Sequence, residues 1–220
     1  KFTASIYDTV GWVSPWILRG KPILQRATQL RLGWDENVPE DLSNAWSDWL
    51  KCLRSVSSIV FSRCLKPTAV DPGYCEFHVF CDASEMAYGC CKYLRCVGIN
   101  GEVSSILIAS KAYVAPLKQH TIPRLELQAA SKAVSLACSV RKELGLEHAM
   151  IHYWTDSMIV IGYISNDSRR FRTFVSNRVS HIRALSNAED WRHVVSAENP
   201  ADLLSRPQLQ VDLRFWERGP

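Results

Sequence analysis

The chain of 220 residues lacks any apolar run near the roughly 18 residues that a membrane-spanning helix needs, so we expect no membrane partner. It also lacks internal repeats and low-complexity segments. It begins at Lys1 rather than Met and shows no charged-then-apolar leader, from which we expect a segment of a longer polypeptide. Its apolar fraction of 47% predicts a globular protein with one good core and an appendage.

Cys-x-x-Cys pairs are absent, although the chain contains eight cysteines. Three of them, Cys81, Cys90 and Cys91, lie within apolar runs typical of strands. Buried thiols in a reducing compartment are therefore favoured over zinc ligands or disulfides. The net charge of +4 is compatible with nucleic-acid binding without establishing it.

Two hydrolase signatures are also missing. A serine hydrolase of the α/β type would carry a Gly-x-Ser-x-Gly elbow, and none is present. An aspartic protease needs Asp-Thr/Ser-Gly, but Val10 and Met158 stand where glycine would be required. Both classes are excluded.

Residues 1–65 have a helical pattern. The first helix begins at Ser14, a candidate N-cap, and we expect Gly20 and Pro22 to kink or split it before it ends at Gly33. A second helix starts near Pro39 and presents a broad Leu and Trp face, which favours packing against a neighbouring domain. Residues 66–74, rich in Pro and Gly, are typical of a linker.

Short strands begin at residue 75. Alternation and apolar runs predict strands over 75–84, 87–95, 104–114, 149–157 and 190–196, with a hairpin at Asn100-Gly101. Helical spacing predicts helices over 122–143, 168–185 and 199–206. This order favours a mixed α/β domain.

Glu126 is an unexpected residue in the helix 122–143. Its face is otherwise a stripe of small apolar residues, namely Ala129, Ala130, Ala133 and Ala137. A carboxylate there should be buried, and a buried carboxylate needs a cation or a proton. The alternatives are a glutamate that reaches water at the helix edge, or a capping-box partner for a nearby hydroxyl.

Three further acids follow apolar elements. Asp82 ends the first strand, Asp156 ends the fourth, and Asp202 lies in the last helix. Each has a local alternative, respectively an Asx turn, a helix cap and a solvated first turn. Together with Glu126 they form a set that would need divalent cations to offset the repulsion. Two ions about 3.5–4 Å apart would activate water for phosphodiester hydrolysis.

Four stretches containing these acids resemble the ribonuclease H (RNase H) domain of Bel/Pao-type LTR retrotransposon polyproteins. They are FCDASEMAYG, IPRLELQAA, YWTDSMIVIGYI and WRHVVSAENPADLLSR, and the similarity covers about residues 75–206. The stretch from Tyr7 to Leu50 resembles the end of the reverse transcriptase region of that family, and RFWERGP resembles the stretch that leads toward the integrase.

The resemblance implies an RNase H-like α/β fold, a five-stranded mixed sheet flanked by helices, with an N-terminal helical segment. It further implies four regions. They are a reverse transcriptase tail (thumb- or connection-like) over 1–65, a linker over 66–74, the RNase H-like domain over 75–206, and an extension toward the integrase region over 207–220.

The resemblance also assigns roles. It implies a two-metal-ion endonuclease that cuts the RNA strand of RNA/DNA hybrids, with Mg²⁺ (or Mn²⁺) held by Asp82, Glu126, Asp156 and Asp202. His193 precedes Asp202 as a mobile histidine does in related enzymes, and it is a secondary catalytic candidate. The strand-like pattern around His193 equally favours a structural role.

Binding of a hybrid would depend mainly on phosphate contacts. The candidates for nucleic-acid binding are Ser84, Arg124, Ser157, Arg169, Arg170, Arg172 and Asn199, together with Lys111, Lys118, Arg178 and Arg183. A solvated basic face explains the cations equally well, local turn bonds explain the serines, and helix capping is favoured for Asn199. The short link around Asn166 leaves little room for a basic protrusion, so the upstream polymerase is expected to help hold the substrate.

The expected partners are an RNA/DNA hybrid and the polymerase domain of the same polyprotein, inside cytoplasmic virus-like particles. The alternative is a catalytically silent RNase H-like connection module, or a nucleic-acid-binding module. Intact acids argue against both.

Overall fold

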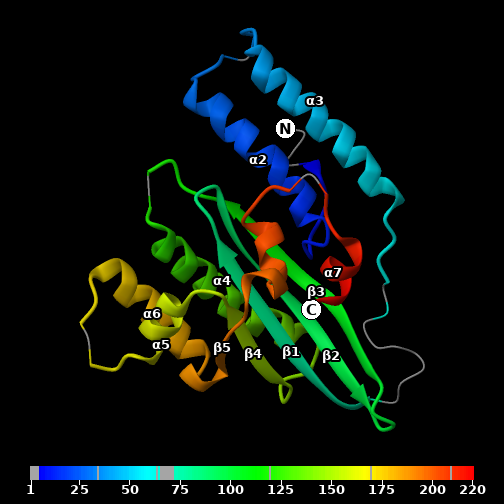
Figure 1. The fold of residues 1–220 in the computed structure, drawn as a ribbon, viewed down its shortest axis with the longest axis vertical. Coiled ribbons are helices and arrows are strands. Elements are labelled where there is room, and N and C mark those ends of the chain that lie inside the picture. Colours follow the sequence, from blue (N-terminus) through cyan, green and yellow to red (C-terminus); the bar gives the residue numbers. More distant parts are fainter. Residues whose placement is uncertain are drawn as a thin grey trace.

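The structure, a computed structural model, describes residues 5–33, 35–62, 64, 72–118, 120–168, 170–208 and 210–220. Its centre is a five-stranded sheet in the order β3-β2-β1-β4-β5 (Figure 1). The strands are β1 (Pro72–Ala83), β2 (Ala87–Gly98), β3 (Val103–Val114), β4 (Met150–Thr155) and β5 (Trp191–His193). The first three are antiparallel neighbours, whereas β4 runs parallel to β1 and β5 parallel to β4. The expected mixed α/β sheet is confirmed.

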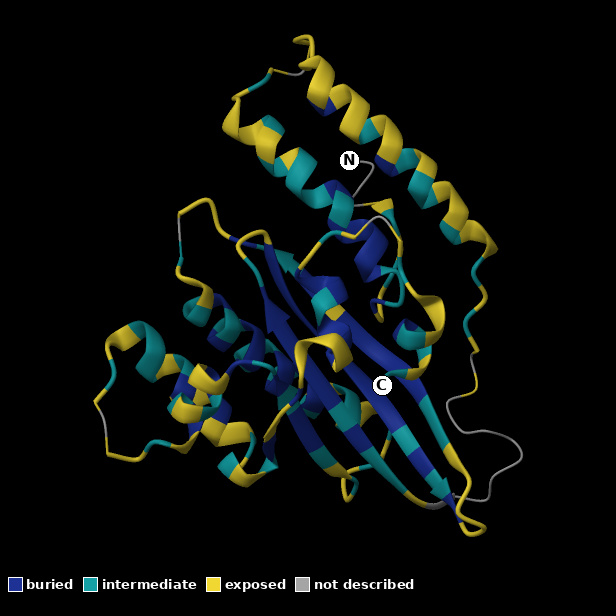
Figure 2. Cartoon of the chain, viewed as in Figure 1, coloured by how far each residue is buried: buried dark blue, intermediate teal, exposed yellow. Residues whose placement is uncertain are grey.

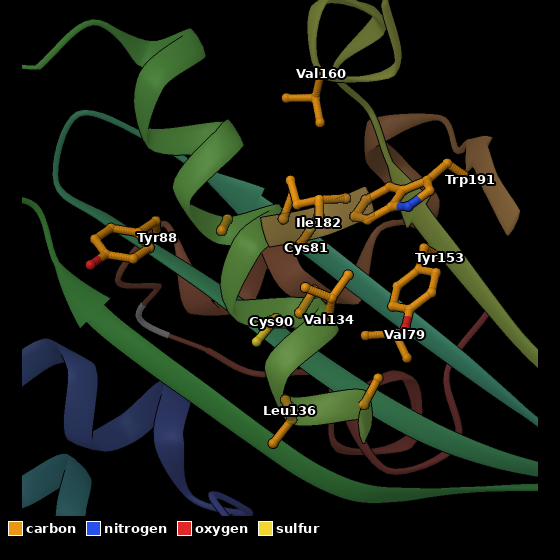
Figure 3. Packing of buried hydrophobic residues seen from close by; sticks show 14 of the residues in the cluster. Val79, Cys81, Tyr88, Cys90, Val134, Leu136, Tyr153, Val160, Ile182 and Trp191 are labelled. Atoms are coloured by element: carbon orange, nitrogen blue, oxygen red, sulfur yellow. The ribbon is translucent and has the colours of Figure 1, made fainter. Parts of the chain in front are cut away.

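One face of the sheet is covered by α4 (Ile122–Glu143), which packs on β1 and β2, and α6 (Thr173–Leu185) packs against α4. Ala129, Ala130, Ala133 and Ala137 are all 0% exposed. The small side chains let α4 approach the strands, as the alanine stripe predicts. Figure 3 shows this core, with Val134 of α4 near Val79 and Cys90 of the sheet.

The opposite face is covered by segments from both ends of the chain. These are α2 (Ser14–Gln29), the 3-10 helix η4 (Pro200–Leu204) and α7 (Leu213–Arg218). Trp216 of α7 is fully buried, and its indole nitrogen donates to the carbonyl of Trp12 at 2.7 Å. The central strands are therefore buried between two layers (Figure 2).

The N-terminal helices form a hairpin in which α3 (Glu40–Ser55) packs on α2. Gly20 does not split α2: a Cβ there would lie 2.5 Å from the Trp49 ring, so the glycine lets α3 approach closely. Trp49 Nε1 donates to the Trp16 carbonyl at 2.8 Å. The expectation of a helix divided at Gly20 and Pro22 is wrong, because α2 continues through both residues.

The ends of α2 also differ from expectation. Val13 stands at the N-cap and Ser14 is the first helical residue, while Leu30 rather than Gly33 ends the helix. Just before the helix, the Asp8 carboxylate accepts the backbone N–H groups of Gly11, Trp12 and Val13 at 2.9–3.0 Å. These bonds fix the turn that leads into α2, whereas the helix itself has no side-chain cap.

The remaining helices are short. They are α5 (Met158–Ser165) and the 3-10 turns η1 (Val56–Ser58), η2 (Ala188–Asp190) and η3 (Ser196–Glu198). Most of the predicted linker 66–74 lies outside the described residues, and its end already belongs to β1. Among the described residues, no helix is long and apolar enough to cross a membrane. The division of the chain into four regions stays a prediction.

The cysteine expectation needs one correction. Cys75 and Cys96 form a disulfide between β1 and β2. The two residues are directly opposite each other in the antiparallel register, which places their side chains together. Cys81, Cys90 and Cys91 are buried free thiols, as expected.

Candidate active site

Two of the predicted acids meet where neighbouring strands end. Asp82 is the penultimate residue of β1, and Asp156 directly follows β4. Because β1 and β4 are parallel and Cys81 pairs with Thr155, both carboxylates come to the same edge of the sheet. Asp82 is 4% exposed, and Asp156 is half-buried. This edge is where open α/β sheets place their chemistry.

Glu126, on the second turn of α4, reaches the same edge. Ser157 Oγ donates to Glu126 Oε2 at 2.5 Å, and Ser157 Oγ in turn accepts the backbone N–H of Val160 at 3.3 Å. Ser157 thus caps α5 and binds Glu126 at once. Glu126 is half-buried rather than buried, and it is not a capping-box partner at the start of α4, because its hydrogen bond runs to Ser157 on another element.

Asp202 is carried by η4. Its Oδ1 lies 3.3 Å from Arg206 Nη1, and its Oδ2 accepts from Gln208 Nε2 at 3.0 Å. Asn199 caps this helix, as the sequence favoured, by accepting the backbone N–H of Ala201. The Asn199 amide also donates to the Cys81 carbonyl at 3.2 Å, which ties η4 to the end of β1.

Asp82, Glu126 and Asp202 each lie within electrostatic range of Asp156. Burial raises the pKa of Asp82 to about 7, the hydrogen bond from Ser205 opposes this shift, and the charges of Asp156 and Asp202 add to it. Burial and Asp156 likewise raise the pKa of Glu126 and of Asp202, against the bonds from Ser157 and the charge of Arg206. Asp156 is the charge that all three share.

Each carboxylate is turned toward a donor of its own. Ser205 Oγ donates to Asp82 Oδ2, and Ser196 Oγ donates to Asp156 Oδ2 at 2.6 Å. Sequence reasoning missed both serines. Ser205 lies 123 residues from Asp82 and Ser196 lies 40 residues from Asp156, and no local pattern links residues so far apart.

The donor set fits Mg²⁺ or Mn²⁺, because it consists of carboxylate oxygens whose mutual repulsion a divalent cation would offset. Within the described part of the chain, no three His, Cys, Asp or Glu side chains are grouped closely enough to hold one ion. Mg²⁺ does not require such a group, since it keeps several waters and takes one or two carboxylates together with substrate phosphates.

His193 lies in β5 and is exposed. It pairs with Thr155 of β4, next to Asp156. Its backbone is therefore held in the sheet, as the strand-like pattern indicated. Its catalytic role stays a prediction.

The basic candidates divide into two groups. Arg178 is used within the fold, since it donates to Gln128 Oε1 at 2.7 and 3.0 Å and stacks over Phe174 at 3.5 Å. Arg183 is similarly bound to the Ile164 carbonyl. Arg170, Arg172, Lys111 and Lys118 are exposed, and so is Arg183 despite its bond to Ile164.

Three nucleic-acid candidates remain to be placed. Arg124 is half-buried and lies 5.2 Å from the Phe174 ring. Ser84 is held by the turn after β1, where it accepts from Met86 N and donates to the Ser205 carbonyl at 2.7 Å. Arg169 lies outside the described residues.

A family model for the Pao retrotransposon-like RNaseH-like domain matches residues 1–157, which is more than half of the chain. The chain therefore belongs to this family of retrotransposon RNase H-like domains. The match begins at residue 1 and so includes the N-terminal helices as well as β1 to β4. No curated protein matches the sequence significantly.

Several solved structures are similar to part of the chain. An N-terminal RNase H domain from Mycobacterium tuberculosis is 14% identical with a TM-score of 0.39, covering 59% of this chain and 90% of that one. RNase H1 from the archaeon Halobacterium salinarum is 17% identical with a TM-score of 0.38, covering 60% and 94%. A foamy viral protease-reverse transcriptase in complex with double-stranded DNA is 11% identical with a TM-score of 0.35, covering 80% and 30%.

Proposed function

We propose that the chain is a divalent-metal-dependent endonuclease that hydrolyses the RNA strand of RNA/DNA hybrids during retrotransposon reverse transcription. The observation that carries this proposal is the convergence of Asp82, Glu126 and Asp202 on Asp156 from four separate elements. Acids brought together in this way repel one another, and a bound divalent cation would offset that repulsion.

The four acids would hold Mg²⁺ or Mn²⁺, which when bound supplies an activated water and stabilises the leaving oxygen. Asp82 is the central ligand in this proposal, because it is the most buried of the acids and feels two of the others. Ser157 and Ser196 orient Glu126 and Asp156 through hydrogen bonds. The exposed Arg170 and Arg172 are proposed to contact phosphates near α6.

The test is cleavage of a labelled RNA/DNA hybrid with Mg²⁺, beside single-stranded RNA, duplex DNA and an EDTA control. We expect cutting only of RNA in the hybrid, and its loss in Asp82→Asn and in Asp156→Asn. Asp48→Asn is the matched control, because Asp48 is exposed on α3, where it pairs with the exposed Lys51. Retained cleavage in both active-site variants would refute the proposal.

The alternative is a module that binds hybrids without cutting them. Hybrid binding by the wild type, with no cleavage in either Mg²⁺ or Mn²⁺, would favour it. Adding the upstream polymerase domain then separates the two cases, because a partner-dependent nuclease regains cleavage and a silent module does not.

A further inference from the structure

Ser205 connects two of the four acids. It follows η4 directly, is 0% exposed, and donates through Oγ to Asp82 Oδ2. Its Oγ also lies 3.2 Å from the carbonyl of Asp202, and its backbone N–H donates to that carbonyl at 3.1 Å. One buried residue therefore contacts the side chain of Asp82 and the backbone of Asp202.

The surroundings of Ser205 hold it in this position. The Ser84 hydroxyl donates to its carbonyl at 2.7 Å from the turn after β1. At the other end of η4, Asn199 donates to the Cys81 carbonyl at 3.2 Å. Between them Leu204 lies against Gly89, where a Cβ would come within 2.5 Å of Leu204 Cβ. The helix that carries Asp202 is thus fastened to the strand that carries Asp82.

We propose that Ser205 is a positioning residue, which aims the Asp82 carboxylate and sets its separation from Asp202 so that the two acids can share divalent cations. This inference rests on the proposed function for the identity of the ions. Without the hydroxyl, Asp82 keeps the backbone hydrogen bond from Ala83 but loses the Ser205 donor that links its carboxylate to the end of η4. Loss of such an outer-shell partner typically weakens metal affinity about 10- to 100-fold.

The matched control for Ser205 is Ser110. It is also buried, at 3% exposed, and its Oγ donates to the Gly11 carbonyl at 2.5 Å, where β3 meets the N-terminal segment. Ser110→Ala removes a comparable buried hydrogen bond without touching an acid. Ser205→Cys is the second test variant, since its slightly larger thiol leaves no cavity while supplying only a weak donor.

The experiment is calorimetric titration of the full chain with Mn²⁺, beside thermal unfolding in EDTA and steady-state hybrid cleavage. We expect Ser205→Ala and Ser205→Cys to weaken Mn²⁺ binding about 10- to 100-fold. Their kcat should fall while KM for the hybrid stays within twofold. Ser110→Ala should lower the unfolding temperature and leave Mn²⁺ affinity unchanged.

Each outcome decides the proposal. Unchanged Mn²⁺ affinity in both Ser205 variants, or a wild type that binds no Mn²⁺, overturns it. A lower unfolding temperature alone, as in Ser110→Ala, reduces Ser205 to a packing role and also overturns it. Weakened Mn²⁺ binding in a chain that cuts no hybrid, even after the upstream polymerase domain is added, supports the positioning role and refutes the nuclease function, so the two failures are distinguishable.

Discussion

Ser157 Oγ donates to Glu126 Oε2 at 2.5 Å while it caps α5, so one hydroxyl joins two helices at the site. Ser157→Ala should lower the free energy of unfolding by roughly 2 kcal/mol, because a helix cap contributes about 1 kcal/mol and a bond to a carboxylate at least as much. Urea unfolding in EDTA measures this. Ser139→Ala, at an exposed site within α4, should change it by less than about 0.5 kcal/mol. Equal effects of the two variants would contradict the double role of Ser157 as cap of α5 and donor to Glu126.

Asp82→Asn should stabilise the metal-free protein, because burial raises the pKa of Asp82 to about 7. A raised carboxyl pKa favours folding at low pH, and this contribution is lost as pH rises from about 4 to 7. The free energy of unfolding of the variant should therefore increasingly exceed that of the wild type as pH rises over that range. Above pH 7 the difference should be roughly 1–3 kcal/mol.

Thermal unfolding from pH 4 to 8 in EDTA checks this, with Asp48→Asn as the exposed control. Added Mg²⁺ should stabilise the wild type more than Asp82→Asn, since the variant lacks a ligand. A gap between wild type and variant that does not change with pH would show that Asp82 is not perturbed.

Lys92 is a buried cation far from the acids. Its side chain is 0% exposed, donates to the Ala137 carbonyl at 2.9 Å and lies over the Phe77 ring at 3.5 Å. Burial, with a smaller effect of Arg141, lowers the pKa of Lys92 to about 7. At pH 7, Lys92→Met should be more stable than the wild type by roughly 1–4 kcal/mol.

The pH dependence of stability tests whether the pKa of Lys92 is lowered in the folded chain. Between pH 7 and its ordinary pKa of 10.5, the unfolded chain binds the proton that the folded chain has released. Wild-type stability should therefore rise over this range, and the advantage of Lys92→Met should shrink. Chemical denaturation at pH 7, 8 and 9 measures the stability difference between Lys92→Met and the wild type. Lys132→Met, at a half-buried position, is the control. A constant advantage would mean that Lys92 stays charged in the fold.

Gly89 sets how closely η4 approaches the sheet. An added Cβ would lie 2.5 Å from Leu204 Cβ and 2.8 Å from the Lys111 carbonyl oxygen. Gly89→Ala should therefore destabilise the fold by roughly 1–3 kcal/mol, and it should reduce hybrid cleavage because Asp202 moves with η4.

Gly162 is the matched control, since it lies in α5 with nothing within 4 Å of an added Cβ. Gly162→Ala should raise the free energy of unfolding by about 0.5–1 kcal/mol, because alanine has the higher helix propensity. Urea unfolding of both variants, followed by the cleavage assay, tests the pair. If Gly89→Ala left the free energy of unfolding unchanged, η4 would not be closely packed against the sheet.

Local patterns were enough to predict most of the elements. Strand alternation and the alanine stripe of α4 depend on neighbours within a few residues, so β1 to β5 and α4 could be predicted. The sequence also suggested the four acids as a set, because each stands next to an apolar element, and their role as metal ligands stays a prediction. The approach of Asp82 and Asp156 to one edge follows from the parallel pairing of β1 with β4, whereas Glu126 and Asp202 reach it through the packing of α4 and η4.

The tertiary structure decided what depends on register and on distant segments. The disulfide between Cys75 and Cys96 and the burial of Lys92 both depend on which residues of β1, β2 and α4 face each other. Trp216 bonds Trp12 across 204 residues, although neither end of the chain carries a local signal for the other. Ser205 reaches Asp82 in the same way. Periodicity shows which face of an element is buried, whereas only the packed fold determines which residue lies against it.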